Sequence, residues 1–124
     1  MEPSISFVTL GVADLERSVA FYRDGLGLST QGIIGTEFEN GAVAFFKLRG
    51  GLRLALWPRR SIAADSGLAE QAPAPTSFTL AHNTNTAAEV DHVMAQAAAA
   101  GGVIVKLAQK TFYGGYAGYF QDPD

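Results

Sequence analysis

Few residues of this sequence have types and spacing that could form a catalytic or metal-binding group. The 124 residues contain no cysteine, and their two histidines are His82 and His92. These histidines do not have the H-x-H or H-E-x-x-H spacing that places two ligands on one metal ion. No serine lies in a G-x-S-x-G turn, where a hydroxyl is presented as a nucleophile. The sequence therefore predicts no catalytic pair and no metal site made of neighbouring residues, and we expect both histidines to be structural.

The segment Phe112–Asp124, FYGGYAGYFQDPD, is the strongest binding signal because it mixes aromatic residues with glycines. Glycines beside aromatic residues at the junction of a loop and a strand let the backbone approach a bound molecule closely. We therefore take Phe112, Tyr113 and Tyr116 as candidate ligand-binding residues.

Composition limits the possible partners. The chain is 48% hydrophobic and 17% charged, with a formal net charge of −3, which is typical of one globular domain. Lysines and arginines are scattered, so no basic stripe is available for nucleic acid. No apolar run reaches the ~18 residues of a membrane span, and MEPSISF lacks the basic start of a secretion signal. We expect a cytoplasmic protein that binds neither nucleic acid nor membrane.

The hydrophobic pattern of the first half predicts one helix between strands. Residues 4–12, SISFVTLGV, are apolar on both faces, as in a strand that is covered on both sides. Asp14 is a suitable N-cap for a helix that ends near Gly25. Three strands are predicted next, at about residues 28–34, 42–48 and 52–57.

The second half repeats this order with one strand fewer. Residues 75–83, PTSFTLAHN, have the pattern of a strand, and SFTLA aligns with FVTLG 70 residues earlier. Thr86 and Glu89 form a capping box at the start of a second helix. Two more strands are predicted, at residues 103–107 and 115–121.

The repeat predicts one domain made of two modules. Module one is expected at residues 1–58 and module two at residues 76–124, with a linker at 59–75 because that stretch is long and has no clear period. The fold class expected is α+β, with two βαβββ modules in a mixed sheet. The terminal Asp-Pro-Asp has the composition of a turn, so we expect a truncated module two that lacks its last strand.

The sequence resembles the vicinal oxygen chelate superfamily, which groups glyoxalases, bleomycin resistance proteins and dioxygenases. The motifs that carry the resemblance are FVTLGVADLERSVAFYRDGLGL near the start, SFTLAHN with the capping-box helix, and GYFQDPD at the end. The resemblance implies two curved sheets that form a cup with the helices outside, and commonly a homodimer. In that family the last turn continues into a glycine and a final strand.

Metal-using members of the family carry four ligands on the cup face. The matching positions here are Phe7, Leu54 and Ser77, and the fourth falls beyond Asp124. Phenylalanine and leucine cannot ligate a cation, and a lone serine is a poor ligand. The resemblance therefore implies no metal and no other cofactor, which argues against a glyoxalase I or an extradiol dioxygenase reaction.

The same positions imply the lining of the cup, because residues two apart in a strand share a face. The function predicted is metal-independent binding of a small, partly apolar organic ligand, with no catalytic residue identified. The alternatives are a glyoxalase-like lyase or isomerase with an unrecognised general base, and an antibiotic-binding resistance protein of the bleomycin type. The predicted ligand-binding residues are Phe7, Thr9, Leu54, Leu56, Ser77, Thr79, Phe112, Tyr113 and Tyr116.

Overall fold

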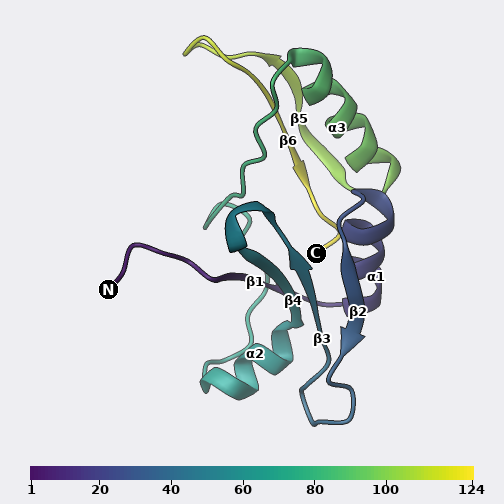
Figure 1. The fold of residues 1–124 in the computed structure, drawn as a ribbon, viewed down its shortest axis with the longest axis vertical. Helices are drawn as coiled ribbons and strands as arrows, with labels where there is room; N and C mark the ends of the chain where they lie inside the picture. The colour runs from purple at the N-terminus through teal and green to yellow at the C-terminus, as the bar shows by residue number, and fades with distance from the viewer.

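The computed structural model describes residues 1–124 and has the expected α+β fold, with helices and strands in two groups along its length (Figure 1). None of its helices is long and apolar enough to cross a membrane. The elements of the first half are β1 (Phe7–Val12), α1 (Leu15–Ala20), the π-helical turn η1 (Phe21–Gly25), β2 (Thr30–Ile34), β3 (Val43–Lys47), the 3-10 turn η2 (Arg49–Gly51) and β4 (Arg53–Pro58). The remaining elements are α2 (Arg59–Ser66), α3 (Ala87–Ala99), β5 (Val103–Lys110) and β6 (Tyr116–Gln121).

The first module forms a four-stranded mixed sheet in the order β1-β4-β3-β2. β1 runs parallel to β4, whereas β3 is antiparallel to both of its neighbours. One face of the sheet packs against α1, and the residues between them form the hydrophobic core. The buried members of this core are Leu10, Val12, Val19, Ala44, Phe46, Leu54 and Leu56.

Helix α1 begins as its sequence predicts. Asp14 has an extended backbone, and its carboxylate accepts a hydrogen bond from the backbone N–H of Arg17 at 3.1 Å. This bond satisfies one of the N–H groups that a helix start leaves without a partner. The helix continues into η1, and Phe21 there lies 6.3 Å from Phe120 between ring centroids. The first helix therefore contacts both modules.

Residues 59–66 form helix α2 and not the start of an unstructured linker. Helix α2 packs against β1 and β4, on the side of the sheet opposite α1. A Cβ atom at Gly11 would lie 2.8 Å from Cγ of Arg59, so glycine is required for this close approach. The Arg59 guanidinium also donates a hydrogen bond to the Gly11 carbonyl at 3.2 Å. The segment expected to be a linker, residues 59–75, therefore begins with a helix, and the start of this helix has no side-chain cap that the sequence could reveal.

The second module contains helix α3 and the antiparallel hairpin of β5 and β6. The capping box is confirmed, since the Thr86 hydroxyl accepts from the Glu89 N–H and the Glu89 carboxylate accepts from the Thr86 N–H. Both bonds measure 3.2 Å. The hairpin and α3 extend away from the first sheet, toward the top of Figure 1.

The strand predicted at residues 75–83 is not formed. No strand pairs with this segment, and its large apolar residues Phe78 and Leu80 are 58% and 56% exposed. An extended segment becomes a strand only when a neighbour satisfies its backbone N–H and C=O groups. The sequence pattern alone could not show that this neighbour is absent from the structure.

Candidate functional site

The register of the first sheet determines which side chains share a face. Directly paired residues of neighbouring strands point to the same side. Phe7 pairs with Arg53, and Thr9 pairs with Ala55, which in turn pairs with Phe45. These residues, together with Trp57 two positions beyond Ala55, lie opposite the α1 core. We call them the open face: Phe7, Thr9, Phe45, Arg53, Ala55 and Trp57.

An aromatic cluster with a cation occupies one end of the open face. The rings of Phe7 and Phe45 meet edge to face, with centroids 5.7 Å apart. The guanidinium carbon of Arg53 lies 5.7 Å from the centroid of the Phe7 ring, in the range of a cation–π contact. Phe7 is 46% exposed, and the Arg53 side chain is exposed as well. These side chains can contact an aromatic ring and an anionic group of one ligand at the same time.

Lys47 adds a second cation beside Arg53. It pairs directly with Arg53 across β3 and β4, and both residues are exposed. Neither takes part in a salt bridge, since the two ion pairs of the chain involve Arg17 and Arg23. Like charges directly opposite each other in a sheet are destabilising. This end of the open face therefore has a positive field without a counterion from the protein.

The far end of the open face is bordered by α2 and by the loop before β3. Trp57 donates its indole N–H to the carbonyl of Asn40 at 2.9 Å, which fixes the ring against that loop. Thr9 contributes an exposed hydroxyl between the two ends.

Leu54 and Leu56 do not belong to this face. They pair with Val8 and Leu10, and both are buried in the core beneath α1, at 4% and 0% exposure. The expectation that they line the cup with Phe7 assumed a strand register that the parallel pairing of β1 and β4 does not have. The positions on the open face that were expected for Leu54 and Leu56 are occupied by Arg53, Phe45 and Trp57. The sequence did contain a signal for the correct face, which is the row of leucines at every second position of β4. Such an apolar row more often faces a core than a ligand.

The other residues predicted to bind a ligand lie away from Phe7 and Thr9. Ser77 and Thr79 are exposed in the unpaired segment before α3. Phe112 and Tyr113 are 100% and 68% exposed, at the tip of the β5–β6 hairpin near the top of Figure 1. Tyr116 donates its hydroxyl proton to Asp91 of α3 at 2.7 Å. The structure thus groups Phe7 with Thr9 and does not bring the others to them.

A metal ion does not fit the side chains that are present. No group of three or more histidine, aspartate or glutamate side chains is arranged to hold a metal, and the chain has no cysteine. On the open face, Phe7 and its neighbours Arg53 and Ala55 offer no ligand atom for a cation.

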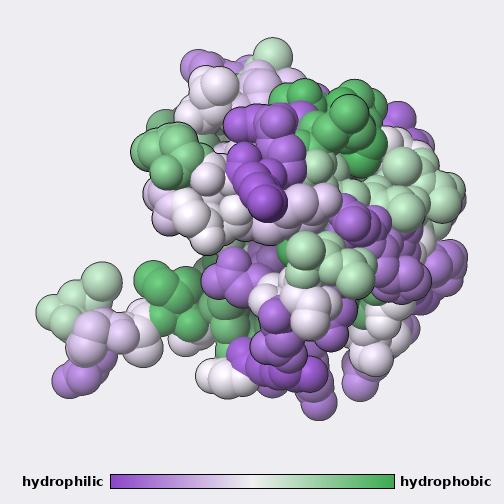
Figure 2. Space-filling view, turned by 90° about the horizontal axis from the view of Figure 1, so that it is seen from above, coloured by the Kyte–Doolittle hydropathy of each residue, from purple (hydrophilic) through white to green (hydrophobic).

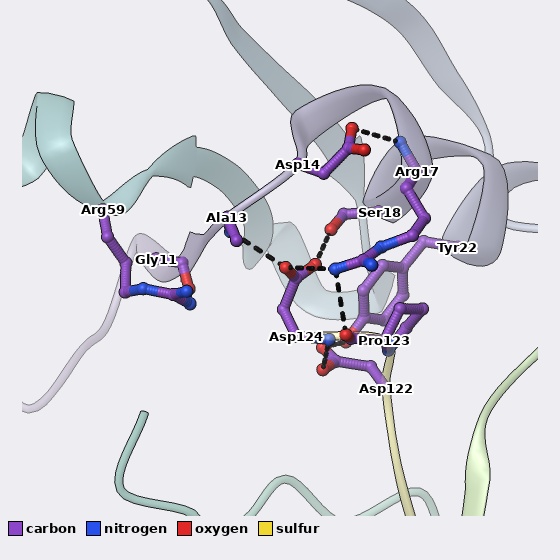
Figure 3. A network of polar contacts seen from close by, with 10 residues as sticks. All are labelled: Gly11, Ala13, Asp14, Arg17, Ser18, Tyr22, Arg59, Asp122, Pro123 and Asp124. Atoms are coloured by element: carbon purple, nitrogen blue, oxygen red, sulfur yellow. Dashed lines mark hydrogen bonds and ion pairs between the residues drawn. The ribbon is translucent and has the colours of Figure 1, made fainter. Parts of the chain in front are cut away.

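A carboxylate network joins the end of β6 to the start of α1 (Figure 3). Asp124 accepts hydrogen bonds from the backbone N–H of Ala13 at 2.9 Å, from the Arg17 guanidinium at 3.0 Å and from the Ser18 hydroxyl. Its side chain is 3% exposed. Burial alone would raise the pKa of Asp124, but the bonds from Ser18, Ala13 and Arg17 outweigh it, so the pKa lies below its ordinary value.

A second carboxylate of the same turn binds a tyrosine. Tyr22 donates its hydroxyl proton to Asp122 at 2.6 Å. Burial, and after it the bond to Asp122, raises the pKa of Tyr22 well above its ordinary value, so the phenol remains protonated. Every carboxylate and hydroxyl of the network is therefore occupied within the chain. The network holds the two modules together and presents no free acid or base to a substrate.

Comparison with known proteins agrees with this architecture. The family model described as the Glyoxalase/Bleomycin resistance protein/Dioxygenase superfamily matches residues 4–124. A glyoxalase-related enzyme from Fulvimarina pelagi is 34% identical, with a TM-score of 0.82 over 98% of this chain and 81% of that one. A glyoxalase/bleomycin resistance protein/dioxygenase from Nocardioides is 26% identical, with a TM-score of 0.75 over 99% of this chain and 78% of that one.

A more distant likeness concerns the fold alone. The fosfomycin resistance protein FosX of Listeria monocytogenes, determined with Mn(II) and a dihydroxypropylphosphonic acid, is 22% identical. Its TM-score is 0.62, over 100% of this chain and 85% of that one. None of the curated proteins is a significant match.

Proposed function

Because the chain belongs to the Glyoxalase/Bleomycin resistance protein/Dioxygenase superfamily, we propose that it binds a small organic ligand on the open face, without a metal ion. The observation that carries the proposal is the cluster of Phe7, Phe45 and Arg53 on this face. The Phe7 ring centroid lies 5.7 Å from the Phe45 ring centroid and 5.7 Å from the guanidinium carbon of Arg53. Binding sites for small molecules are mostly apolar, with a few polar groups that orient the ligand. Two rings and one guanidinium match that description.

The charges of the open face favour an anionic ligand. Arg53 and Lys47 are adjacent, exposed and without acidic partners. A carboxylate or similar group placed between them would relieve their repulsion and accept hydrogen bonds from the planar guanidinium. The ligand class proposed is therefore an aromatic or other planar molecule that carries one anionic group. A cationic drug of the bleomycin type would meet repulsion at this end of the face.

The experiment is a thermal-shift and NMR titration with pairs of aromatic carboxylates and their neutral amides. We expect at least one carboxylate to bind saturably, with its amide weaker by about tenfold or more, since a charge-assisted hydrogen bond contributes about 1.5–3 kcal/mol. The variant Arg53→Gln should lose the preference for the carboxylate. The matched control is Arg49→Gln, an exposed arginine on the neighbouring turn η2.

Two results would contradict the proposal. If acids and amides bind with equal affinity, the open face does not recognise an anion. The same conclusion follows if Arg53→Gln and Arg49→Gln reduce the affinity for the carboxylate equally. A ligand-induced shift that disappears with chelator, together with stoichiometric metal in elemental analysis, would show that a metal ion is required.

Turnover would favour the enzymatic alternative, a glyoxalase-like lyase or isomerase. The open face contains no histidine or carboxylate that could act as a general base, and the nearest hydroxyl is that of Thr9. We expect the molecule to bind saturably and to remain chemically unchanged when its NMR spectrum is monitored over hours.

A further inference from the structure

Strand β4 carries a cation at one end of the open face and an aromatic ring at the other. Arg53 and Trp57 are four residues apart in this strand, and both side chains lie on the open face because positions two apart share a face. At about 3.3 Å per residue, their Cα atoms are separated by about 13 Å. Between them lies Ala55, which is buried at 2% exposure. A molecule bound along β4 therefore rests on the larger side chains at either side of Ala55, which are Phe45 of β3 and Thr9 of β1.

The Trp57 ring is held in place by the loop between β2 and β3. Its indole N–H donates to the Asn40 carbonyl at 2.9 Å. Asn40 has a φ of 55°, in the left-handed region that asparagine adopts more readily than most residues. The loop is closed at its base by Gly35 and Gly41, since a Cβ atom on either glycine would collide with the carbonyl oxygen of the other. Trp57 is therefore a preorganised apolar wall, and a ligand that touches it does not have to immobilise its ring.

Only one direction along β4 from Arg53 is apolar. In the other direction the strand leaves the sheet through η2, and residues 47–53 contain three of the nine lysines and arginines of the chain. Toward Trp57 the next cation is Arg59, whose guanidinium already donates to the Gly11 carbonyl at 3.2 Å. The anionic group and the apolar part of a ligand therefore lie at opposite ends of the face.

The cationic end of the face is accessible to a ligand. Residues 1–6, which lead into Phe7, are exposed and project from the body of the molecule, at the left of Figure 2. This segment points away from the sheet, so it does not cover the cluster of Phe7, Phe45 and Arg53. Every side chain of the open face comes from the first sheet, and none comes from module two.

We propose that the ligand of the open face is an acid whose aromatic ring is separated from its anionic group by an extended apolar chain. The anionic group binds Arg53, the chain lies over the Phe45 ring, and the aromatic ring contacts Trp57. The two ends of the ligand are about 13 Å apart, which is the spacing of Arg53 and Trp57 along β4. The far end is apolar because the one polar group of the Trp57 ring is occupied by Asn40. This inference rests on the proposed function, and it adds the length of the ligand and the residue that selects for this length.

The experiment uses the fluorescence of Trp57, which is the single tryptophan of the chain and reports contact at the far end of the face without a label. The probes are phenylpropanoic, phenylpentanoic and phenyloctanoic acid, each with the phenyl group on the terminal carbon. Only the longest of them spans about 13 Å from its carboxylate to its ring. NMR titration measures the affinity of each acid independently of the fluorescence.

We expect phenyloctanoic acid to bind at least about tenfold more tightly than phenylpropanoic acid, because its chain and ring bury more apolar surface. The emission of Trp57 should shift to shorter wavelength with phenyloctanoic acid, because the bound ring displaces water from the indole. Phenylpropanoic acid should bind at Arg53 without changing the emission.

Substitution of Trp57 provides a second test. In Trp57→Gln the affinity for phenyloctanoic acid should fall to about that for phenylpropanoic acid, whereas the affinity for the short acid should not change. The matched control is Phe38→Gln, which removes a 68% exposed ring from the same loop and should change neither affinity. Circular dichroism shows whether each variant is folded, and the fluorescence result with the unsubstituted protein stands if Trp57→Gln is not.

Three results would overturn the proposal while an acid still binds, so that the proposed function would stand. Phenyloctanoic acid could bind without a change in the emission of Trp57. Phenylpropanoic acid could shift the emission as much as phenyloctanoic acid does. Trp57→Gln and Phe38→Gln could reduce the affinity for phenyloctanoic acid equally. Absence of saturable binding by every aromatic carboxylate would overturn the proposed function and this proposal together.

Discussion

Replacing Asp124 by asparagine tests whether the terminal turn fastens module two to module one. The Asp124 carboxylate is almost fully buried and accepts bonds from Ala13, Arg17 and Ser18 (Figure 3). Ser18 itself is 0% exposed, so its hydroxyl cannot exchange this partner for water without local opening. Asparagine keeps the shape but removes the charge and one of the two acceptor oxygens. We expect a measurable loss of stability.

The size of that loss follows from the three contacts. A hydrogen bond to a charged group contributes about 1.5–3 kcal/mol and a neutral one about 0.5–1.5 kcal/mol, so each of the bonds from Ser18 and Ala13 loses about 1 kcal/mol. The Arg17 side chain is 52% exposed, and its ion pair therefore adds less than about 1 kcal/mol. The free energy of unfolding of Asp124→Asn should fall by about 2 kcal/mol, which corresponds to a decrease in Tm of about 7 °C for a domain of this size.

The pH dependence provides a second readout. The pKa of Asp124 in the folded chain lies below its ordinary value of about 4. Its contribution to stability is therefore complete above that ordinary value and is lost as the pH falls through the folded pKa. The difference in Tm between the unsubstituted protein and Asp124→Asn should therefore become smaller as the pH is lowered from neutral. Most of this decrease should occur below about pH 4.

Thermal and urea unfolding followed by circular dichroism measure both effects. Asp65→Asn on α2 is the control, because Asp65 is exposed and takes part in no side-chain hydrogen bond or ion pair. It should change the free energy of unfolding by less than about 0.5 kcal/mol. The turn does not stabilise the fold as argued if Asp124→Asn and Asp65→Asn have the same Tm at neutral pH. The same holds if the difference in Tm between the unsubstituted protein and Asp124→Asn does not change with pH.

Three further substitutions test other parts of the structure. Tyr22→Phe removes the bond to Asp122 and leaves a carboxylate without its partner, so urea unfolding should show a loss of about 1–2 kcal/mol. Thr86→Ala removes the capping box and should lower the free energy of unfolding by about 1 kcal/mol, with faster hydrogen exchange confined to the first turn of α3. Leu56→Ala should lower the free energy of unfolding by about 3 kcal/mol because Leu56 is fully buried. Leu107→Ala, at a residue that is 75% exposed, should lower it by less than about 0.5 kcal/mol. Similar losses of stability in the two variants would contradict the burial of Leu56.

Local signals in the sequence were sufficient for much of the fold. Asp14 and the Thr86–Glu89 pair mark the starts of helices through bonds within a few residues, and the structure has both bonds. The repeat of FVTLG by SFTLA predicted two related halves. The two helix caps depend on neighbours in the chain, so a single sequence contains all the information that they need.

The errors all concern partners that are distant in the sequence. The segment at residues 75–83 has the pattern of a strand but no neighbouring strand to pair with. Helix α2 follows Pro58 without a side-chain cap, and its position is set by contacts with β1, including the close approach at Gly11. Neither outcome could be derived from periodicity, because both depend on which backbone lies beside which.

The register of one strand pair also decides the class of ligand proposed. If Leu54 and Leu56 had shared a face with Phe7, the site would have been a neutral apolar surface. Parallel pairing instead places Arg53 beside Phe7 and puts both leucines in the core. A shift of one residue exchanges every side chain of a strand between the two faces, so it converts a site for an apolar molecule into one for an anion. The preference for acids over amides therefore tests the register of β1 against β4 as directly as it tests the function.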